Sequence, residues 1–212
     1  MGDIIDSSGL RVQFLHFPID SAISVTAMED QEHMIEVTIT GKEGSSGSSV
    51  VQGDDRSMCT AMVQIAGTAI RMPTATVTEH QSSLPYLYAA LSRHTLLLLR
   101  HAVISVGCSR FHNPGQRLAR WLKAHWHRTG IDSFPFSNQF LSAQVGVDRH
   151  IIGDLLSDFQ SHGIVKSGRN SVTITDQDAL AKRACECYEL AKKATDEYAV
   201  SLADIARAHG AA

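Results

Sequence analysis

Residues 137–174 restrict the fold of this chain more than any other segment. Ser137 is a helix N-cap, and a glycine, Gly146, permits the tight turn that follows a short helical run. Asp148 caps a second helix, which Gly163 ends. Two helices joined by a three-residue turn around a glycine have the spacing of a helix-turn-helix.

The residues after the second helix make this prediction more specific. In residues 164–174, apolar ends flank a polar tip that contains a glycine, Lys166 and Arg169. This pattern predicts a β-hairpin. A hairpin directly after the second helix is the wing of a winged helix, whose tip reaches phosphates beside the groove. Many folds contain a helix-turn-helix alone, so the added wing is the informative feature.

Residues 116–128 predict a further helix that packs against this pair. An Asn-Pro-Gly break at residues 113–115 precedes the helix, and Gly130 ends it. The apolar positions expected in the core of this helix are Leu118, Trp121, Leu122 and Trp126. Those of the helix after Asp148 are Ile151, Ile152, Leu155, Leu156 and Phe159.

A long helix over residues 84–108 carries two apolar stripes. The first comprises Leu87, Leu91, His94, Leu98 and His101, and the second comprises Leu96, Leu99, Val103 and Val106. One face lies on the preceding domain, and a second copy of the helix is the simplest cover for the other. We assign the first stripe to the dimer interface; the alternative is a buried helix in a monomer. His94 and His101 are then a pH-sensitive pair or satisfied interface histidines.

The chain before this helix has β character. Short runs rich in β-branched residues, separated by glycine-containing turns, occupy residues 11–78 and predict a small antiparallel barrel or sandwich. The expected class is α+β. Four segments are predicted: a β-roll or jelly-roll-like barrel over residues 1–80, a dimerisation helix and hinge over 81–112, the winged helix-turn-helix over 113–176, and a C-terminal helix over 177–212.

The charge of the chain is unevenly distributed. The 212 residues have a net charge of −3, which excludes a uniformly basic nucleic-acid binder. Residues 110–176 nevertheless hold 8 Lys and Arg against 5 Asp and Glu. This basic block indicates a nucleic-acid face on one part of the chain, with random charge scatter as the alternative. The four cysteines form no disulfide framework and no apolar run reaches about 20 residues, so we expect a cytoplasmic protein that does not span a membrane.

Four motifs in this order resemble the Crp/Fnr superfamily of bacterial transcription regulators. They are R-L-A-R-W-L (117–122), F-S-N-Q-F-L-S-A-Q-V-G-V-D-R (136–149), the wing, and A-C-E-C-Y (184–188). The resemblance implies a cyclic-nucleotide-binding-like barrel, a dimerisation helix and a winged helix-turn-helix. It also implies a homodimer that binds palindromic double-stranded DNA, with RNA polymerase as a partner.

The same resemblance implies which residues touch DNA. Base contacts fall on Asp148, Arg149, His150 and Asp154, and phosphate contacts fall on Ser137, Asn138, Gln139, Lys166, Ser167 and Arg169. Arg149 donates two parallel hydrogen bonds to guanine in this interpretation. Asp154 departs from the family, which often has a basic or polar residue there. The alternative for each residue is a solvated surface position.

The N-terminal half departs from the family, and the first strands of the barrel are missing or shortened. Lys42 stands where the family has the glutamate that binds the ribose of a cyclic nucleotide, and Arg56-Ser57 is shifted. We therefore expect no cyclic nucleotide and no other cofactor. We expect no metal, because Cys185 and Cys187 on one helix would point their thiols about 200° apart. No catalytic motif is present, which argues against an enzyme.

A function of another class stays open. The winged helix would dock a protein, or the chain would form heterodimers with a full-length relative and not bind DNA by itself. The acidic N-terminal half, with Asp154 and Asp158 on the second helix, favours this alternative.

Overall fold

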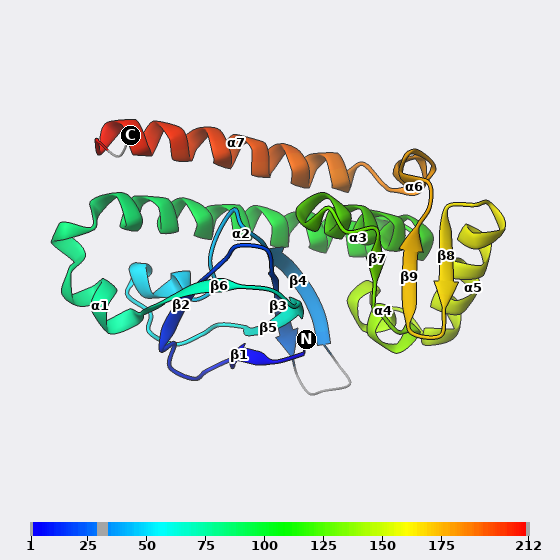
Figure 1. Cartoon of the computed structure of the whole chain (residues 1–212), viewed down its shortest axis with the longest axis horizontal. Coiled ribbons are helices and arrows are strands. Elements are labelled where there is room, and N and C mark those ends of the chain that lie inside the picture. The colour runs from blue at the N-terminus through cyan, green and yellow to red at the C-terminus, as the bar shows by residue number, and fades with distance from the viewer. Residues whose placement is uncertain (1, 29–33, 211–212) are drawn as a thin grey trace. The chain divides into compact units, whose positions relative to one another are not determined.

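The computed structural model describes residues 2–28 and 34–210, and the chain forms two compact units. Unit 1 comprises Met1–Met28, Val37–Val103 and Ala191–Ala212; unit 2 comprises Glu29–Glu36 and Ile104–Leu190. The boundaries of these two units differ from the boundaries of the four segments predicted from the sequence. The reason is that two long helices, α2 (Pro85–Phe111) and α7 (Cys187–Ala208), each contribute residues to both units (Figure 1).

Unit 1 is built on antiparallel strands. They are β1 (Ile4–Asp6), β2 (Phe14–Pro18), β3 (Ala22–Met28), β5 (Thr60–Ile65), β6 (Ala69–Pro73) and the part of β4 (Met34–Thr40) that begins at Val37, since residues 34–36 of β4 belong to unit 2. One sheet has the order β1-β5-β3-β4, and a second sheet pairs β2 with β6. Two short 3-10 segments, η1 (Ser48–Gln52) and η2 (Gln81–Ser83), and one helix, α1 (Thr74–Glu79), complete the connections. The β-rich N-terminal half and the α+β class are confirmed.

The first apolar stripe of α2 faces the interior of unit 1. Leu91 packs in one buried cluster with Leu15 of β2 and Val77 of α1, and Leu87 lies against that cluster. His94 and His101 are 1% and 5% exposed, and Leu98 is half-buried. These side chains were predicted to form the dimer interface, but the fold of a single chain already buries Leu91, His94 and His101 and covers the other two in part. The second stripe is the one left at the surface.

His94 occupies a tight site beside a glycine. A Cβ on Gly44 would lie 1.9 Å from Nε2 of His94, so only glycine allows the ring to come this close. Neither ring nitrogen of His94 makes a hydrogen bond with any residue that the structure describes. Burial lowers the pKa of His94 to about 4, and the nearby Glu43 carboxylate opposes this shift. His94 is therefore a neutral core residue of unit 1.

His101 joins three elements of unit 1. Its Nδ1 lies 3.2 Å from Oγ1 of Thr38 on β4, and its Nε2 lies 3.2 Å from the carbonyl oxygen of Ala191 on α7. The residues of α7 in unit 1 run beside α2 (Figure 1), and Ala194 and Tyr198 pack on Leu97. His101 is thus a satisfied histidine, but within one subunit and not between two.

Unit 2 contains the end of α2 and a three-stranded sheet with several helices. Its complete elements are α3 (Pro114–Thr129), β7 (Ser133–Phe134), α4 (Asn138–Val145), α5 (Arg149–Ser161), β8 (Val165–Gly168), β9 (Ser171–Ile174) and α6 (Gln177–Arg183). The strand order is β7-β9-β8. Asn113 caps α3 with a capping box to Gln116, and Gly130 ends the helix with a φ of 66°.

Aromatic rings fill the centre of unit 2. Phe136 is 1% exposed and stacks on Phe134 and Phe140, with ring centroids 5.3 and 4.9 Å away. Trp121 meets Phe136 edge-on at 5.1 Å, and His125 does so at 6.0 Å. Other fully buried side chains of the unit are Leu118, Leu122, Leu141, Ile152, Leu156 and Phe159. Most of the predicted core positions are therefore buried.

Although α2 has 27 residues, no helix within the described ranges combines the length and apolar character needed to cross a membrane.

Candidate nucleic-acid interface

Helices α4 and α5 form the predicted helix-turn-helix. Oγ of Ser137 accepts a hydrogen bond from the amide of Phe140 at 3.1 Å, which caps α4. Gly146 ends α4 with a φ of 69° and a ψ of 49°, a left-handed conformation that other residues rarely adopt. Oδ1 of Asp148 accepts from the amide of His150 at 2.9 Å and starts α5. Both caps and the turn lie where the sequence predicts them.

One face of α5 is buried and the other is free. Ile152, Leu156 and Phe159 recur at the i, i+4, i+7 spacing and are at most 2% exposed. Arg149 and His150 in the first turn are exposed, and so is Asp154 one turn later. The side chains assigned to base contacts therefore lie outward along the same helix, at the end that a recognition helix inserts first.

Ile151 lies on the exposed part of α5, and the prediction that it belongs to the core is wrong. Its side chain is 41% exposed. The spacing of Ile152, Leu156 and Phe159 already completes a buried face, which is the signal that would have placed Ile151 outside it.

The hairpin is a wing of the expected kind. Strands β8 and β9 pair from Val165 with Ile174 to Gly168 with Ser171, which leaves Arg169 at the tip. Lys166 and Arg169 are exposed, and Ser167 is half-buried. The backbone amide of Ser167 donates to Oε1 of Gln160 on α5 at 2.8 Å. The wing is thus attached to α5 while its cations point to solvent.

The predicted phosphate contacts at the start of α4 differ in accessibility. Gln139 is exposed, whereas Ser137 and Asn138 are half-buried. The hydroxyl of Ser137 already caps the helix, so what this end of α4 offers an anion is its backbone N–H groups. In the same way, the carboxylate of Asp148 is engaged as a cap, which favours a structural role over base contact.

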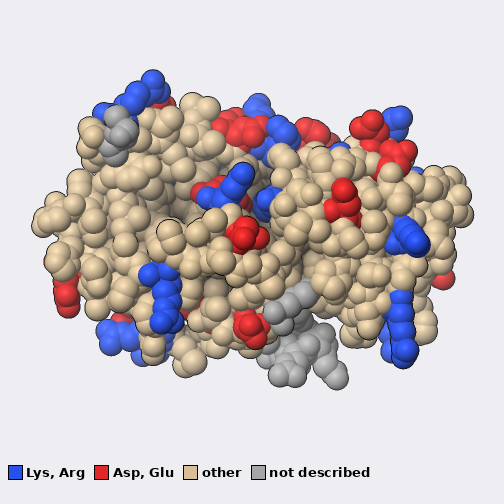
Figure 2. Space-filling model, in the orientation of Figure 1, with Lys and Arg blue, Asp and Glu red and all other residues tan. Residues whose placement is uncertain are grey.

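The acidic groups on α5 are not equivalent. Oδ2 of Asp158 lies 3.2 Å from Nη1 of Arg183, and Oδ1 lies 3.3 Å from Nδ1 of His162. Asp158 therefore has partners within unit 2, which weakens its use as evidence for a protein-docking surface. On the face drawn in Figure 2, Lys and Arg lie in separate small groups among Asp, Glu and uncharged residues, so this face shows no continuous basic patch.

Comparison with known protein families identifies the segment that contains the helix-turn-helix and the wing. The family model of the Crp-like helix-turn-helix domain matches residues 116–183, which extend from α3 through the wing to α6. No curated protein matches the sequence at a significant level.

Solved structures share the fold of most of the chain at low identity. FixK2 from Bradyrhizobium japonicum is 13% identical with a TM-score of 0.71, and the match covers 87% of this chain and 93% of FixK2. TTHB099, a CRP-family transcriptional regulator from Thermus thermophilus, is 14% identical with a TM-score of 0.70 (86% and 93% covered). The c-di-GMP-responsive regulator CLP of Xanthomonas campestris is 16% identical with a TM-score of 0.68 (83% and 91% covered).

Proposed function

We propose that this chain, which has the fold of the Crp/Fnr transcription regulators and carries a Crp-like helix-turn-helix domain, binds palindromic DNA as a homodimer. The Crp-like helix-turn-helix domain at residues 116–183 and the shared fold support the predicted resemblance to that superfamily, whose regulators are not enzymes. The observation that carries the proposal is the exposed first turn of α5 beside a wing with two exposed cations. RNA polymerase as a partner and a cytoplasmic location belong to the same proposal.

The dimer is argued from the second stripe of α2. Leu96, Leu99 and Val103 are 52%, 60% and 65% exposed, and they recur at intervals of three and four residues. In unit 2, Val106 and Phe111 on the same helix are 70% and 78% exposed. Apolar side chains repeated in this way form the seam of paired helices, and two copies of one seam are self-complementary.

A charge in this seam should separate the subunits. We expect Leu99→Glu to weaken dimerisation about 10-fold or more, because the seam would bury two like charges facing each other. Sedimentation equilibrium measures the dissociation constant. The matched control is Ile70→Glu on β6, since Ile70 is also 60% exposed. A Leu99→Glu chain that dimerises as tightly as the Ile70→Glu chain would contradict this interface.

The DNA-binding proposal is tested by selecting bound duplexes from a random pool and measuring their affinity across a salt series. A dimer with one α5 per half-site should select half-sites about 34–36 Å apart. Affinity should fall steeply with salt, because Lys and Arg displace phosphate counterions. A salt-independent protein that selects no sequence would support the alternative function, a protein-interaction module.

Arg149 should carry sequence preference, and Lys166 should not. We expect Arg149→Ala to lose discrimination at one base pair, at a cost of about 1–3 kcal/mol for a bidentate contact. Lys166→Ala should instead weaken binding to all sequences similarly and reduce the salt slope by about 1. Binding assays on the selected site and on single-base variants separate the two effects. Full retention of site preference by Arg149→Ala would remove the base-reading assignment.

We also propose that DNA binding does not depend on a cyclic nucleotide. Ligand pockets are usually about 300–1,000 Å³. The cavity among the strands of unit 1, which Asp6, Ser46 and Ser57 help to line, measures about 90 Å³, and another cavity of unit 1, of about 390 Å³, is lined instead by residues of α2 and α7. Nη1 of Arg56 donates to the carbonyl of Gly9 at 2.8 Å, so this guanidinium already serves the fold. Adding cyclic AMP to the binding series should therefore leave affinity unchanged.

A further inference from the structure

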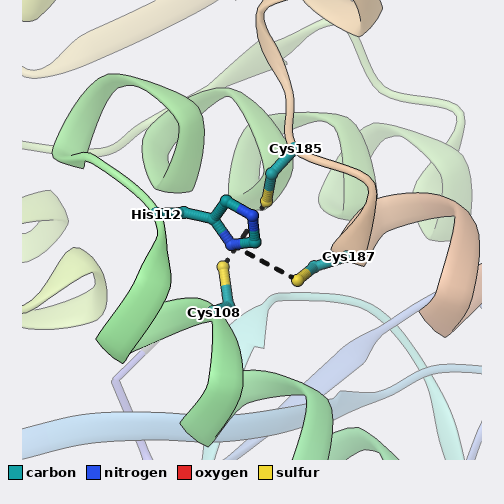
Figure 3. A group of neighbouring side chains, drawn as sticks. All are labelled: Cys108, His112, Cys185 and Cys187. Carbon is teal, nitrogen blue, oxygen red and sulfur yellow. Dashed lines mark hydrogen bonds between the residues drawn. The ribbon is translucent and has the colours of Figure 1, made fainter.

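Four side chains in unit 2 come together although the sequence separates them widely. Cys108 lies on the last turn of α2, His112 directly follows the end of that helix at Phe111, and Cys185 and Cys187 lie where α6 ends and α7 begins. Their four ligand atoms all lie within 4.8 Å of one another. Figure 3 shows the three thiols and the imidazole directed toward a common point.

The local backbone explains the convergence. The amide of His112 donates to the carbonyl oxygen of Cys108 at 3.2 Å, which continues the helical turn one residue past α2 and places the two side chains on one face. The prediction that Cys185 and Cys187 share a helix is wrong, because α6 ends at Arg183 and α7 begins at Cys187. Cys185 lies in the turn between the helices, where its carbonyl accepts from the amide of Tyr188 at 3.1 Å. Because only Cys187 lies on a helix, the separation of about 200° between the two thiols does not apply, and both reach the same group of ligand atoms.

The spacing of the ligand atoms fits one tetrahedral ion. Sγ of Cys108 lies 3.5 Å from Sγ of Cys185, and Sγ of Cys187 lies 3.6 Å from Nδ1 of His112. Zinc–sulfur bonds of about 2.3 Å at tetrahedral angles place the sulfurs about 3.8 Å apart. In a four-iron cluster each ligand binds a different iron, so the ligands must surround a larger object than a single ion. The four ligand atoms are thus spaced for a single metal ion.

The carboxylate of Glu186 orients the imidazole of His112 so that it can bind a metal ion. Nε2 of His112 lies 3.1 Å from Oε1 of Glu186, so the ring donates its proton there and turns the lone pair of Nδ1 toward the thiols. Metal-binding histidines almost always donate their other N–H in this way. Glu186 lies between Cys185 and Cys187 in sequence, so one turn supplies two thiols and the group that orients the imidazole.

The surroundings suit a closed site. Cys108, Cys185 and Cys187 are 1%, 4% and 6% exposed, and the side chain of His112 is 14% exposed. Burial raises the pKa of the Cys108 and Cys187 thiols, whereas the positive charge of Arg120 favours the Cys108 thiolate. A divalent cation would displace the thiol protons to solvent and balance most of the resulting charge.

We propose that Cys108, His112, Cys185 and Cys187 bind one structural zinc ion. Four protein ligands leave no open coordination position, which is typical of structural and not of catalytic zinc. The ion would join the segment that precedes α3 to the segment that follows α6, and so hold together the two ends of the domain matched at residues 116–183. The inference does not depend on which DNA sequence, if any, the protein reads.

The test measures metal in the untagged full-length protein, purified without chelators. Mass spectrometry of the metal content should give about one zinc per chain. Replacement with Co²⁺ should produce the thiolate charge-transfer and visible bands of tetrahedral cobalt. Glu186→Gln, at a side chain that is 72% exposed, should weaken zinc affinity about 10–100-fold in a competition assay with a chelator. Cys185→Ser should abolish stoichiometric zinc.

Cys59→Ser is the matched control, since Cys59 is a free, partly buried cysteine in unit 1. It should retain one zinc per chain and the cobalt spectrum of the parent. Three results would overturn the proposal: a folded parent that binds neither ion, iron with its broad visible absorption in place of zinc, or a Cys185→Ser chain with as much zinc as the Cys59→Ser chain. If Cys185→Ser does not fold, the parent titration and Glu186→Gln still decide the question.

Discussion

Acidification from pH 7 to pH 4 should destabilise both units, by about 3 kcal/mol for one buried histidine in each. Burial is the main cause that lowers the pKa of His94 and of His125 from 6.5 to about 4. Between these values the unfolded chain binds a proton that the folded chain does not. The stability that each neutral, buried histidine gives its unit is therefore fully present above pH 6.5, and it is lost as the pH falls toward 4.

Unit 2 offers a direct measurement of this effect. Both tryptophans of the chain, Trp121 and Trp126, lie on α3, so tryptophan fluorescence in urea reports on unit 2. His125 is held between Trp121, with ring centroids 3.6 Å apart, and the Glu36 carboxylate, whose Oε2 lies 3.8 Å from Nε2. Burial lowers the pKa of His125, and the charges of Arg128 and Arg120 act in the same direction. The Glu36 carboxylate and the hydrogen bond to the Trp121 carbonyl oxygen raise this pKa, but burial outweighs them.

The decisive comparison is between the parent and His125→Phe at each pH. Phenylalanine keeps a ring in the aromatic cluster but cannot bind a proton. The pH dependence of the free energy of unfolding should therefore fall by about one proton between pH 6.5 and 4, and other titrating groups cancel in the difference. His94→Phe is the control, because it alters unit 1 and should leave the fluorescence-detected slope unchanged. An equal slope in the parent and His125→Phe would contradict the assignment.

Phe136→Ala should cost unit 2 about 3–5 kcal/mol of unfolding free energy. The ring is 1% exposed and contacts four other rings, so its removal leaves a cavity and breaks the aromatic cluster. Urea denaturation followed by tryptophan fluorescence measures the loss, and DNA binding should decline with the folded fraction.

Phe111→Ala is the matched substitution for this experiment, since Phe111 is 78% exposed in the same unit. Its cost should stay below about 1 kcal/mol, as is usual at the surface. Similar losses from the two substitutions would mean that the aromatic cluster does not hold unit 2 together.

The winged helix could be predicted from the sequence because local chemistry specifies it. Ser137 and Asp148 cap their helices by hydrogen bonds to amides two or three residues away, and Gly146 permits the turn between them. The hairpin follows from the pairing of residues 165–168 with 171–174, which are neighbours in the chain. Interactions over so few residues depend little on the rest of the fold.

The role of the α2 stripes could not be predicted in this way. Periodicity shows that a helix has two apolar faces, but it does not tell which face the same chain covers. Leu15 and Val77 cover the face that contains Leu91, and residues of α7 cover Leu97, from positions far along the sequence. The prediction therefore identified the helix and both stripes but not which of the two stripes the chain itself covers.

By itself, the sequence determined the helix-turn-helix, its wing, the exposed arginine at the start of α5 and the α+β order of the chain, because caps, turns and periodicity act within a few residues. Only the tertiary structure decided that His94 is a core residue and that Cys108 and His112 meet Cys185 and Cys187. Those contacts join residues between 50 and about 80 positions apart, such as Gly44 with His94 and Cys108 with Cys185. Proximity of that kind arises from packing of the whole chain, and no local pattern encodes it.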